Sequence, residues 1–202
     1  PIHNGHLRLG REAYEQFGLD AVWFMPAGNP PHKKNHKITE GEMRERMVKL
    51  AIADTPYFLY SDFELKREGN TYTAQTLSLL RGEYREDEFY FIIGADSLYQ
   101  VVQWCHPDRV MKLAVLLVAG RAYHDKHQPF ERQIEYLTSR YGARIYPIRC
   151  SEMDVSSEEI RAAVADGYSI HGFVPDAVEE YIMDHGLYRF GAGNPVLDVK
   201  GE

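Results

Sequence analysis

Two histidines stand three positions apart at the beginning of the sequence, in the stretch PIHNGH. The apolar spacing that follows predicts a helix over 7–17, which ends at Gly18. Since Gly5 has no side chain, a ligand can approach the backbone closely between His3 and His6. The first amides of a helix and the positive end of its dipole also attract anions. A phosphate clamp is one interpretation; a solvated loop and a metal pair are the others, although two histidines fall short of a zinc site's three or four ligands.

Strand-like and helix-like patterns alternate along the rest of the chain. Apolar runs at 21–25, 57–63, 89–93, 114–118 and 143–148 predict short strands. Strands that are apolar throughout and alternate with helices are typical of a parallel sheet covered on both faces. The sequence therefore predicts an α/β fold with a doubly wound parallel sheet. In such sheets, ligands bind beyond the carboxyl ends of the strands.

The segments that follow the predicted strands supply further candidates for a phosphorylated ligand. Glycines, hydroxyls and cations gather there: Gly28, Lys33, Gly94, Asp96, Arg121, Ser156, Ser157 and Arg161. Ser156 and Glu159 have the spacing of a capping box that opens a helix. PIHNGH also combines a glycine with polar side chains at the start of a helix, so we expect it to follow a strand too. We expect roughly a dozen residues before Pro1, forming an apolar strand and a Gly-rich turn.

Length and composition set the class of protein. The chain has 202 residues, 44% of them hydrophobic, which suits one domain over 1–190 with a Gly- and Asn-rich tail over 191–202. The net charge of −7 and the absence of a basic block argue against nucleic acid and an anionic membrane as partners. Cys105 and Cys150 form no CxxC pattern, so we expect reduced thiols in the cytoplasm. The pattern leaves the oligomeric state open.

The same motifs resemble those of one family, in chain order. His-x-Gly-His at a helix start resembles the signature of the nucleotidyltransferase superfamily. PIHNGHL resembles the end of the GGTFDPIHxGHL loop of bacterial nicotinate-nucleotide adenylyltransferases, and WFMPAGNPPHK resembles their lysine loop. EGNTYTAQTLSLL, FYFIIGADSL and VSSEEIR resemble their YT-x-x-TL segment, IIGAD strand end and SSTxIR phosphate loop. The matches extend from residue 1 to about 190, nearly the whole chain.

The resemblance implies a Rossmann-like nucleotidyltransferase fold and a reaction. AMP would pass from ATP to the phosphate of nicotinate mononucleotide, giving nicotinate adenine dinucleotide and pyrophosphate in NAD synthesis. Mg²⁺ would bridge the phosphates with few protein ligands. The catalytic residues would be His3, His6 and Arg161. ATP would contact His3, Gly5, His6, Gly94, Asp96, Arg121, Ser156, Ser157 and Arg161, and the acceptor would contact Lys33, Thr73 and Trp104.

Several candidates also have simpler structural interpretations. Lys33 would then be a solvated loop residue, Asp96 and Thr73 helix caps, and Trp104 a core residue. The resemblance has two departures as well: Glu158 replaces the family's threonine, and Arg121 is followed by Ala-Tyr in place of Pro-Gly. We expect the Glu158 carboxylate to point to solvent or to cap its own helix. Alternative functions are a nicotinamide mononucleotide or other phosphorylated acceptor, and a non-catalytic nucleotide-binding module.

Overall fold

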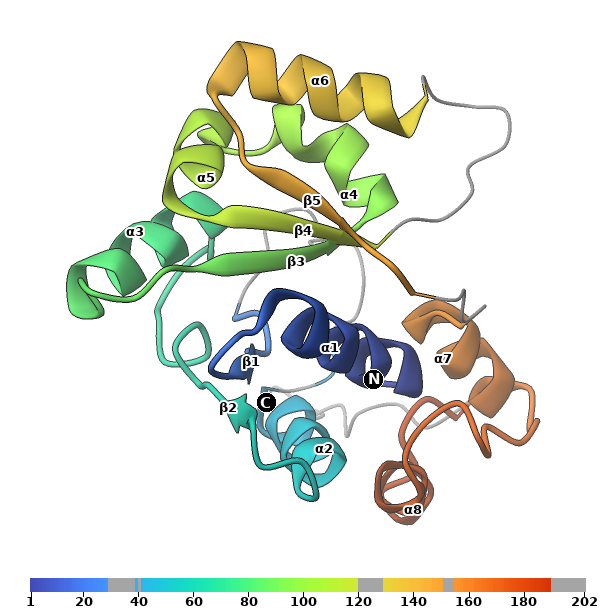
Figure 1. The fold of residues 1–202 in the computed structure, drawn as a ribbon. Coiled ribbons are helices and arrows are strands. Elements are labelled where there is room, and N and C mark those ends of the chain that lie inside the picture. Colours follow the sequence, from blue (N-terminus) through green and yellow to red (C-terminus); the bar gives the residue numbers. More distant parts are fainter. Residues whose placement is uncertain (29–38, 40, 120–128, 151–154, 190–202) are drawn as a thin grey trace, which may run out of the picture.

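The computed structural model describes residues 1–28, 39, 41–119, 129–150 and 155–189 (Figure 1). Helices and strands alternate along most of this chain, as the sequence predicts. The helices are α1 (Asn4–Phe17), α2 (Gly41–Ile52), α3 (Thr73–Glu83), α4 (Ala95–Gln100), the short 3₁₀ helix η2 (Val101–Gln103), α5 (Pro107–Leu113), α6 (Phe130–Tyr141), α7 (Ser157–Ala165) and α8 (Asp176–Asp184). The strands are β1 (Val22–Phe24), β2 (Phe58–Tyr60), β3 (Tyr90–Gly94), β4 (Val115–Ala119) and β5 (Ile145–Ile148).

All of these strands pair in parallel, which confirms the predicted α/β class. They form two sheets, one of β1 and β2 and one in the order β3-β4-β5. In the first sheet Trp23 lies opposite Leu59, and in the second Leu117 lies between Ile92 and Tyr146. Parallel pairing brings the carboxyl ends of neighbouring strands to one edge. The strand expected before Pro1 stays a prediction.

Strand β4 is the centre of the larger sheet and is buried on both faces. Leu116 and Val118 pack into the core under α3 to α6, and Val115 and Leu117 pack against α1 around Ala13. Successive side chains of a strand point to opposite faces, so an apolar run without alternation requires cover on both sides. Figure 1 shows that cover, with α4, α5 and α6 on one face of the sheet and α1 on the other.

The end of the described chain packs against its beginning. Apolar side chains of α7 and α8, among them Ile160 and Val178, form one buried cluster with Met47 of α2, and Ile2 packs against this cluster. In Figure 1, α7 lies beside the N-terminal end of α1. Among the described residues, no helix is long and apolar enough to cross a membrane.

Several helix ends follow the predicted signals. Gly18 and Gly142 end α1 and α6 in the left-handed region, with φ of 59° and 64°. The chain from Ala95 to Leu113 divides into α4, η2 and α5. The break before α5 comes from His106, which takes a φ of 54°, and from Pro107, which suits the first position of a new helix.

Candidate active site

The two histidines of PIHNGH come together at the start of α1. His3 is the N-cap residue, and its ring centroid lies 3.7 Å from that of His6. The backbone N–H of His3 donates to Nδ1 of His6 at 3.3 Å. When Nδ1 of a neutral imidazole accepts a hydrogen bond, Nε2 carries the proton. His6 is exposed, and in this tautomer Nε2 is its donor nitrogen.

Gly5 makes room for the buried ring of His3. A β-carbon at residue 5 would lie 3.0 Å from both Cε1 and Nδ1 of His3 and 3.3 Å from a methyl group of Val155. Contacts this short require a shift in the neighbour. The glycine of the motif thus has a steric reason inside the protein, in addition to the close ligand approach expected from the sequence.

His3 is neutral in the folded protein. Its residue is only 7% exposed, and burial, together with the nearby charge of His6, lowers the pKa of His3 to about 3. Nδ1 of His3 is buried and has no hydrogen-bond partner among the described residues. A buried polar atom without a partner costs about 1–3 kcal/mol, so such atoms are uncommon away from functional sites. His3 can act as a hydrogen-bonding group, and it cannot serve as a cation near neutral pH.

The N-terminus of α7 lies against the start of the chain. The hydroxyl of Ser157 donates to the carbonyl of Pro1 at 2.8 Å. Ser156 caps the helix, accepting from the backbone of Glu159 at 3.1 Å while the Glu159 carboxylate accepts from the Ser156 amide at 2.9 Å. This confirms the predicted capping box. Glu158 is exposed in the same turn, as expected for the residue that departs from the family pattern.

Arg161 and Arg44 both lie close enough to Tyr188 for their charges to act on its hydroxyl. No pattern in the sequence singles out Arg44. Burial raises the pKa of the Tyr188 hydroxyl, while the hydrogen bond with Thr39 and the charges of Arg161 and Arg44 act to lower that pKa. Arg161 is exposed and, among the described residues, forms no salt bridge. Its guanidinium is therefore available for an anion.

Arg44 fastens both ends of the segment that carries Lys33. Its guanidinium donates to the carbonyl of Ala27, to that of Gly28 at 3.4 Å and, through Nε, to that of Thr39 at 3.0 Å. Burial lowers the pKa of Arg44. The sequence offers no signal for this role, because an arginine in an amphipathic helix is usually a solvated residue. Lys33 itself lies outside the described residues, as does Arg121.

Gly28 is required where the chain leaves β1. A β-carbon at residue 28 would lie 2.3 Å from the carbonyl oxygen of Glu64, which no backbone contact allows. The Glu64 side chain accepts from the hydroxyl of Thr76 at 2.7 Å and lies 3.4 Å from the amide of Gly28. The hydroxyl of Thr71 is buried nearby without a partner among the described residues. No pattern in the sequence singles out Glu64 or Thr71.

Thr73 is the first residue of α3, and the N-cap residue is Tyr72. The interpretation of Thr73 as the cap of this helix is therefore wrong by one position. Tyr72 provides no side-chain cap, and its carbonyl accepts from the amides of Gln75 and Thr76. Contact of Thr73, at the start of α3, with the acceptor substrate stays a prediction.

Gly94, Asp96 and Trp104 lie on the larger sheet and the helices that follow it. Gly94 ends β3 and caps α4, with open space on the side where a β-carbon would project. The interpretation of Asp96 as the cap of this helix is wrong, because Asp96 is exposed in the first turn of α4, where the helix dipole favours a carboxylate. Trp104 packs edge-on against Phe91, with centroids 6.2 Å apart, and is partly exposed. The contact with Phe91 agrees with its interpretation as a core residue, and its ligand role stays a prediction.

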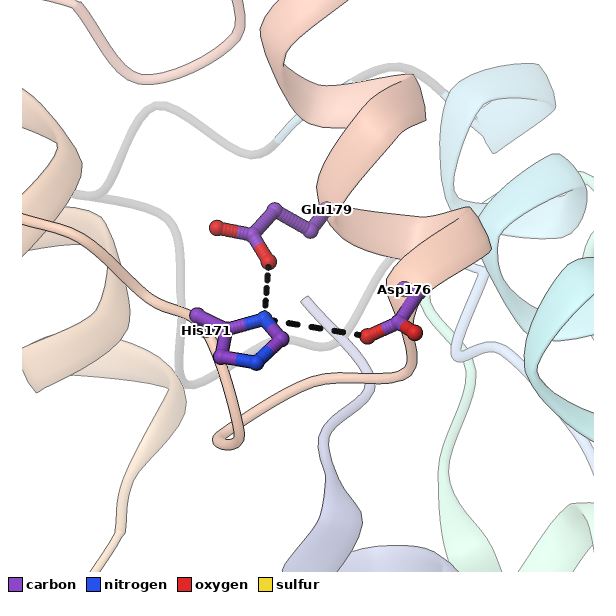
Figure 2. A group of neighbouring side chains, drawn as sticks. All are labelled: His171, Asp176 and Glu179. Atoms are coloured by element: carbon purple, nitrogen blue, oxygen red, sulfur yellow. Dashed lines mark hydrogen bonds and ion pairs between the residues drawn. The ribbon is translucent and has the colours of Figure 1, made fainter.

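One group among the described residues has ligand atoms close enough to hold a metal ion, and it includes neither His3 nor His6. Figure 2 shows its members, with the carboxylates of Glu179 and Asp176 turned toward the ring of His171. Nδ1 of His171 lies 3.3 Å from Glu179 and 3.8 Å from Asp176. The side chains of His171 and Asp176 are 75% and 82% exposed. These contacts attach the loop before α8 to the first turns of that helix.

Comparisons with known proteins agree on one family. Residues 1–163 match the cytidylyltransferase-like family. A protein of Lachnoclostridium phytofermentans named "probable nicotinate-nucleotide adenylyltransferase" is 44% identical over 93% of this chain and 94% of its own length. A protein of the same name from Syntrophotalea carbinolica is 39% identical over 94% of this chain and 93% of its own.

Solved structures show the same fold. The nicotinic acid mononucleotide adenylyltransferase of Plasmodium falciparum, complexed with NaAD, superposes with a TM-score of 0.76 over 93% of this chain and 92% of its own, at 16% identity. The same enzyme complexed with APC gives a TM-score of 0.73 over the same shares. By its matched residues and by the identity of its relatives, the chain belongs to the cytidylyltransferase-like family and, within that family, to the nicotinate-nucleotide adenylyltransferases.

Proposed function

We propose that this protein transfers AMP from ATP to the phosphate of nicotinate mononucleotide, releasing pyrophosphate and forming nicotinate adenine dinucleotide. The observation that carries this proposal is the unpartnered Nδ1 of His3, buried beside His6 at the N-terminus of α1. The relatives named nicotinate-nucleotide adenylyltransferase indicate the reaction, and the His3–His6 pair suits that reaction. The expected location is the cytoplasm, in keeping with the two free cysteines, Cys105 and Cys150.

The reaction makes modest demands on the protein. An oxygen of the acceptor phosphate attacks the α-phosphorus of ATP, a new P–O bond forms, and the bond to the bridging oxygen breaks as pyrophosphate leaves. The attacking oxygen is already ionised at neutral pH, so no general base is needed. What remains is alignment of the two phosphates and stabilisation of the charge that builds on their oxygens.

His3 and His6 would meet these phosphate oxygens with hydrogen bonds. His3 is neutral, so its contribution is a fixed dipole in a water-poor place rather than a positive charge. His6 would donate from Nε2, since Nδ1 faces the backbone of His3. Loss of one such donor typically costs 10²–10³ in rate.

The N-terminus of α7 would hold the β- and γ-phosphates. The capping box uses the amides of Ser156 and Glu159, so the amides of Ser157 and Glu158 between them are the donors proposed for an anion. Arg161 would add a bidentate contact. Gly94, Asp96 and Arg121 are proposed for the nucleoside side of ATP, and Lys33, Thr73 and Trp104 for the acceptor.

A divalent cation, Mg²⁺ in our proposal, would reach this site on ATP. The His3–His6 pair supplies nitrogen atoms, whereas Mg²⁺ prefers oxygen ligands, so the pair does not fit a protein-bound Mg²⁺. The only described group with metal-ligand spacing lies elsewhere, at His171. The cation would neutralise phosphate charge when bound, and the residues of the pair would contact the phosphates themselves.

The test is pyrophosphate release from ATP with nicotinate mononucleotide and, separately, with nicotinamide mononucleotide, using the natural full-length protein. Turnover with the first and little with the second is expected. Turnover with the second alone would replace the acceptor, and turnover with neither would overturn the proposal. In the same assay, His6→Ala should lower kcat far more than it weakens ATP binding.

A further inference from the structure

Asn4, the residue between His3 and Gly5, fastens the first turn of α1 to a distant loop. Its side-chain Nδ2 donates to the carbonyl of Gly172 at 2.8 Å, and its backbone N–H donates to the carbonyl of Phe173 at 2.8 Å. The first N–H groups of a helix have no partner inside that helix. The carbonyl of Phe173 thus satisfies a backbone N–H that the helix itself leaves open, and the carbonyl of Gly172, 168 positions from Asn4, accepts from its side chain.

The loop that receives Asn4 is itself held on both sides. Ile170 and Val174, at 0% and 1% exposure, anchor it in the buried cluster of α7 and α8. Its turn closes through the amide of Phe173, which donates to Ile170 at 3.1 Å, and through Gly172 in the left-handed region at φ 80°. His171 adds the carboxylate contacts seen in Figure 2. The two carbonyls that accept from Asn4 therefore belong to a well-supported turn.

We infer that Asn4 is a positioning residue for the histidine pair, acting by docking the first turn of α1 on the carbonyls of Gly172 and Phe173. His3 precedes this anchor by one residue and His6 follows it by half a turn, so the anchor sets where both rings lie. This inference rests on the proposed function for its kinetic test and on the structure alone for its spectroscopic test.

The far end of the same helix offers a matched control. Gln16 donates to the carbonyl of Arg149 at 2.7 Å and accepts from the Arg149 amide at 2.9 Å. Asn4 and Gln16 thus both tie α1 to distant backbone, and only Asn4 adjoins the histidines. A purely structural role would make the two residues equivalent.

Asn4→Ala and Gln16→Ala should be compared in the full-length protein. Asn4→Ala is expected to lower kcat about 10- to 100-fold with KM for both substrates within about threefold, because small misplacements of reacting groups cost rates of this order. Gln16→Ala should lose at least as much thermal stability and keep its kcat. Asn4→Ser, which keeps a small polar side chain but lacks the amide, should repeat the loss and serves if Asn4→Ala does not fold.

Three kinetic results would overturn the inference: unchanged kcat in the Asn4 variants, an equal fall in kcat for Gln16→Ala, or a rise in KM for one substrate alone. The second readout needs no turnover. The imidazole Cε1–H NMR signals of His3 and His6, in protein without ligand, should move in Asn4→Ala and stay in place in Gln16→Ala. If the wild type proves inactive, the proposed function fails, and these signals alone decide the role of Asn4.

Discussion

The ring of His3 occupies the space that a side chain on Gly5 would take. Cε1 and Nδ1 of His3 both lie 3.0 Å from the position of a β-carbon at residue 5. The histidine and the glycine of the motif therefore depend on each other before any ligand arrives. The spacing of PIHNGH has an internal steric cause.

Replacement of Gly5 by alanine should displace the His3 ring while improving the intrinsic helix propensity of the position by roughly 0.5–1 kcal/mol. We expect kcat to fall about tenfold or more, with a change in unfolding free energy within about 1 kcal/mol. Gly82→Ala in α3, where a β-carbon meets open space, is the control and should keep kcat unchanged. Equal activity of Gly5→Ala and wild type would refute the steric role.

The buried His3 should make the protein sensitive to acid. The unfolded chain binds a proton near the ordinary pKa of 6.5, and the folded protein binds it only near 3. Stability from this group is therefore present above pH 6.5 and is lost as pH falls from 6.5 toward 3. The free energy of unfolding can be measured with urea at pH 7.5 and at pH 5.0. Between these two pH values it should fall by about 2 kcal/mol more in wild type than in His3→Asn. Parallel losses in both proteins would contradict this.

Arg44→Lys keeps the charge but loses most of the hydrogen bonds to the ends of the lysine-bearing segment. Hydrogen bonds from charged groups contribute about 1.5–3 kcal/mol, so we expect the free energy of unfolding to fall by about 1–3 kcal/mol. KM for the acceptor should rise as well. Arg46→Lys, an exposed position on the same helix, is the control. A variant as stable as wild type with an unchanged KM would remove Arg44 from this role.

Glu158 places a negative charge in the first turn of α7, where ATP phosphates are expected. Glu158→Gln should lower KM for ATP about two- to threefold at low salt, the size of one unit charge acting through water over several ångströms. The effect should fade as salt is added. Glu135→Gln on α6 should show no change in KM. A KM that rises in Glu158→Gln would mean that the carboxylate helps binding.

Local features of the fold could be predicted from the sequence because their causes are local. The glycine that ends α1 and the capping box of α7 both follow from residues within one or two turns of the helix end. Burial of β4 on both faces followed from its uninterrupted apolar run. The N-cap of α3 was misplaced by one residue, at Thr73 in place of Tyr72, because no pattern in the sequence states which residue keeps the extended backbone before the helix.

Contacts between distant segments could not be predicted in the same way. The carbonyls of Gly172 and Thr39 are chemically like any others, so nothing in the sequence pairs them with Asn4 and Arg44. The burial of His3 could not be predicted either, because the burial of a histidine outside a regular element depends on which distant residues pack over it. Such contacts form only when the whole chain has folded. The PIHNGH motif could therefore be found in the sequence, and the distant residues that hold it in place could not.

The meeting of α1 and α7 has an electrostatic consequence. The N-terminal ends of α1 and α7 lie close together, since Ser157 donates to Pro1 and Val155 lies beside Gly5, so their two partial positive charges repel each other while no anion lies between them. The ligand-free protein thus stores unfavourable energy at its own site. Simple anions such as sulfate or phosphate should therefore raise its melting temperature beyond their general salt effect. The apparent thermal stability of the protein will then be higher in buffers that contain these ions than in buffers that lack them.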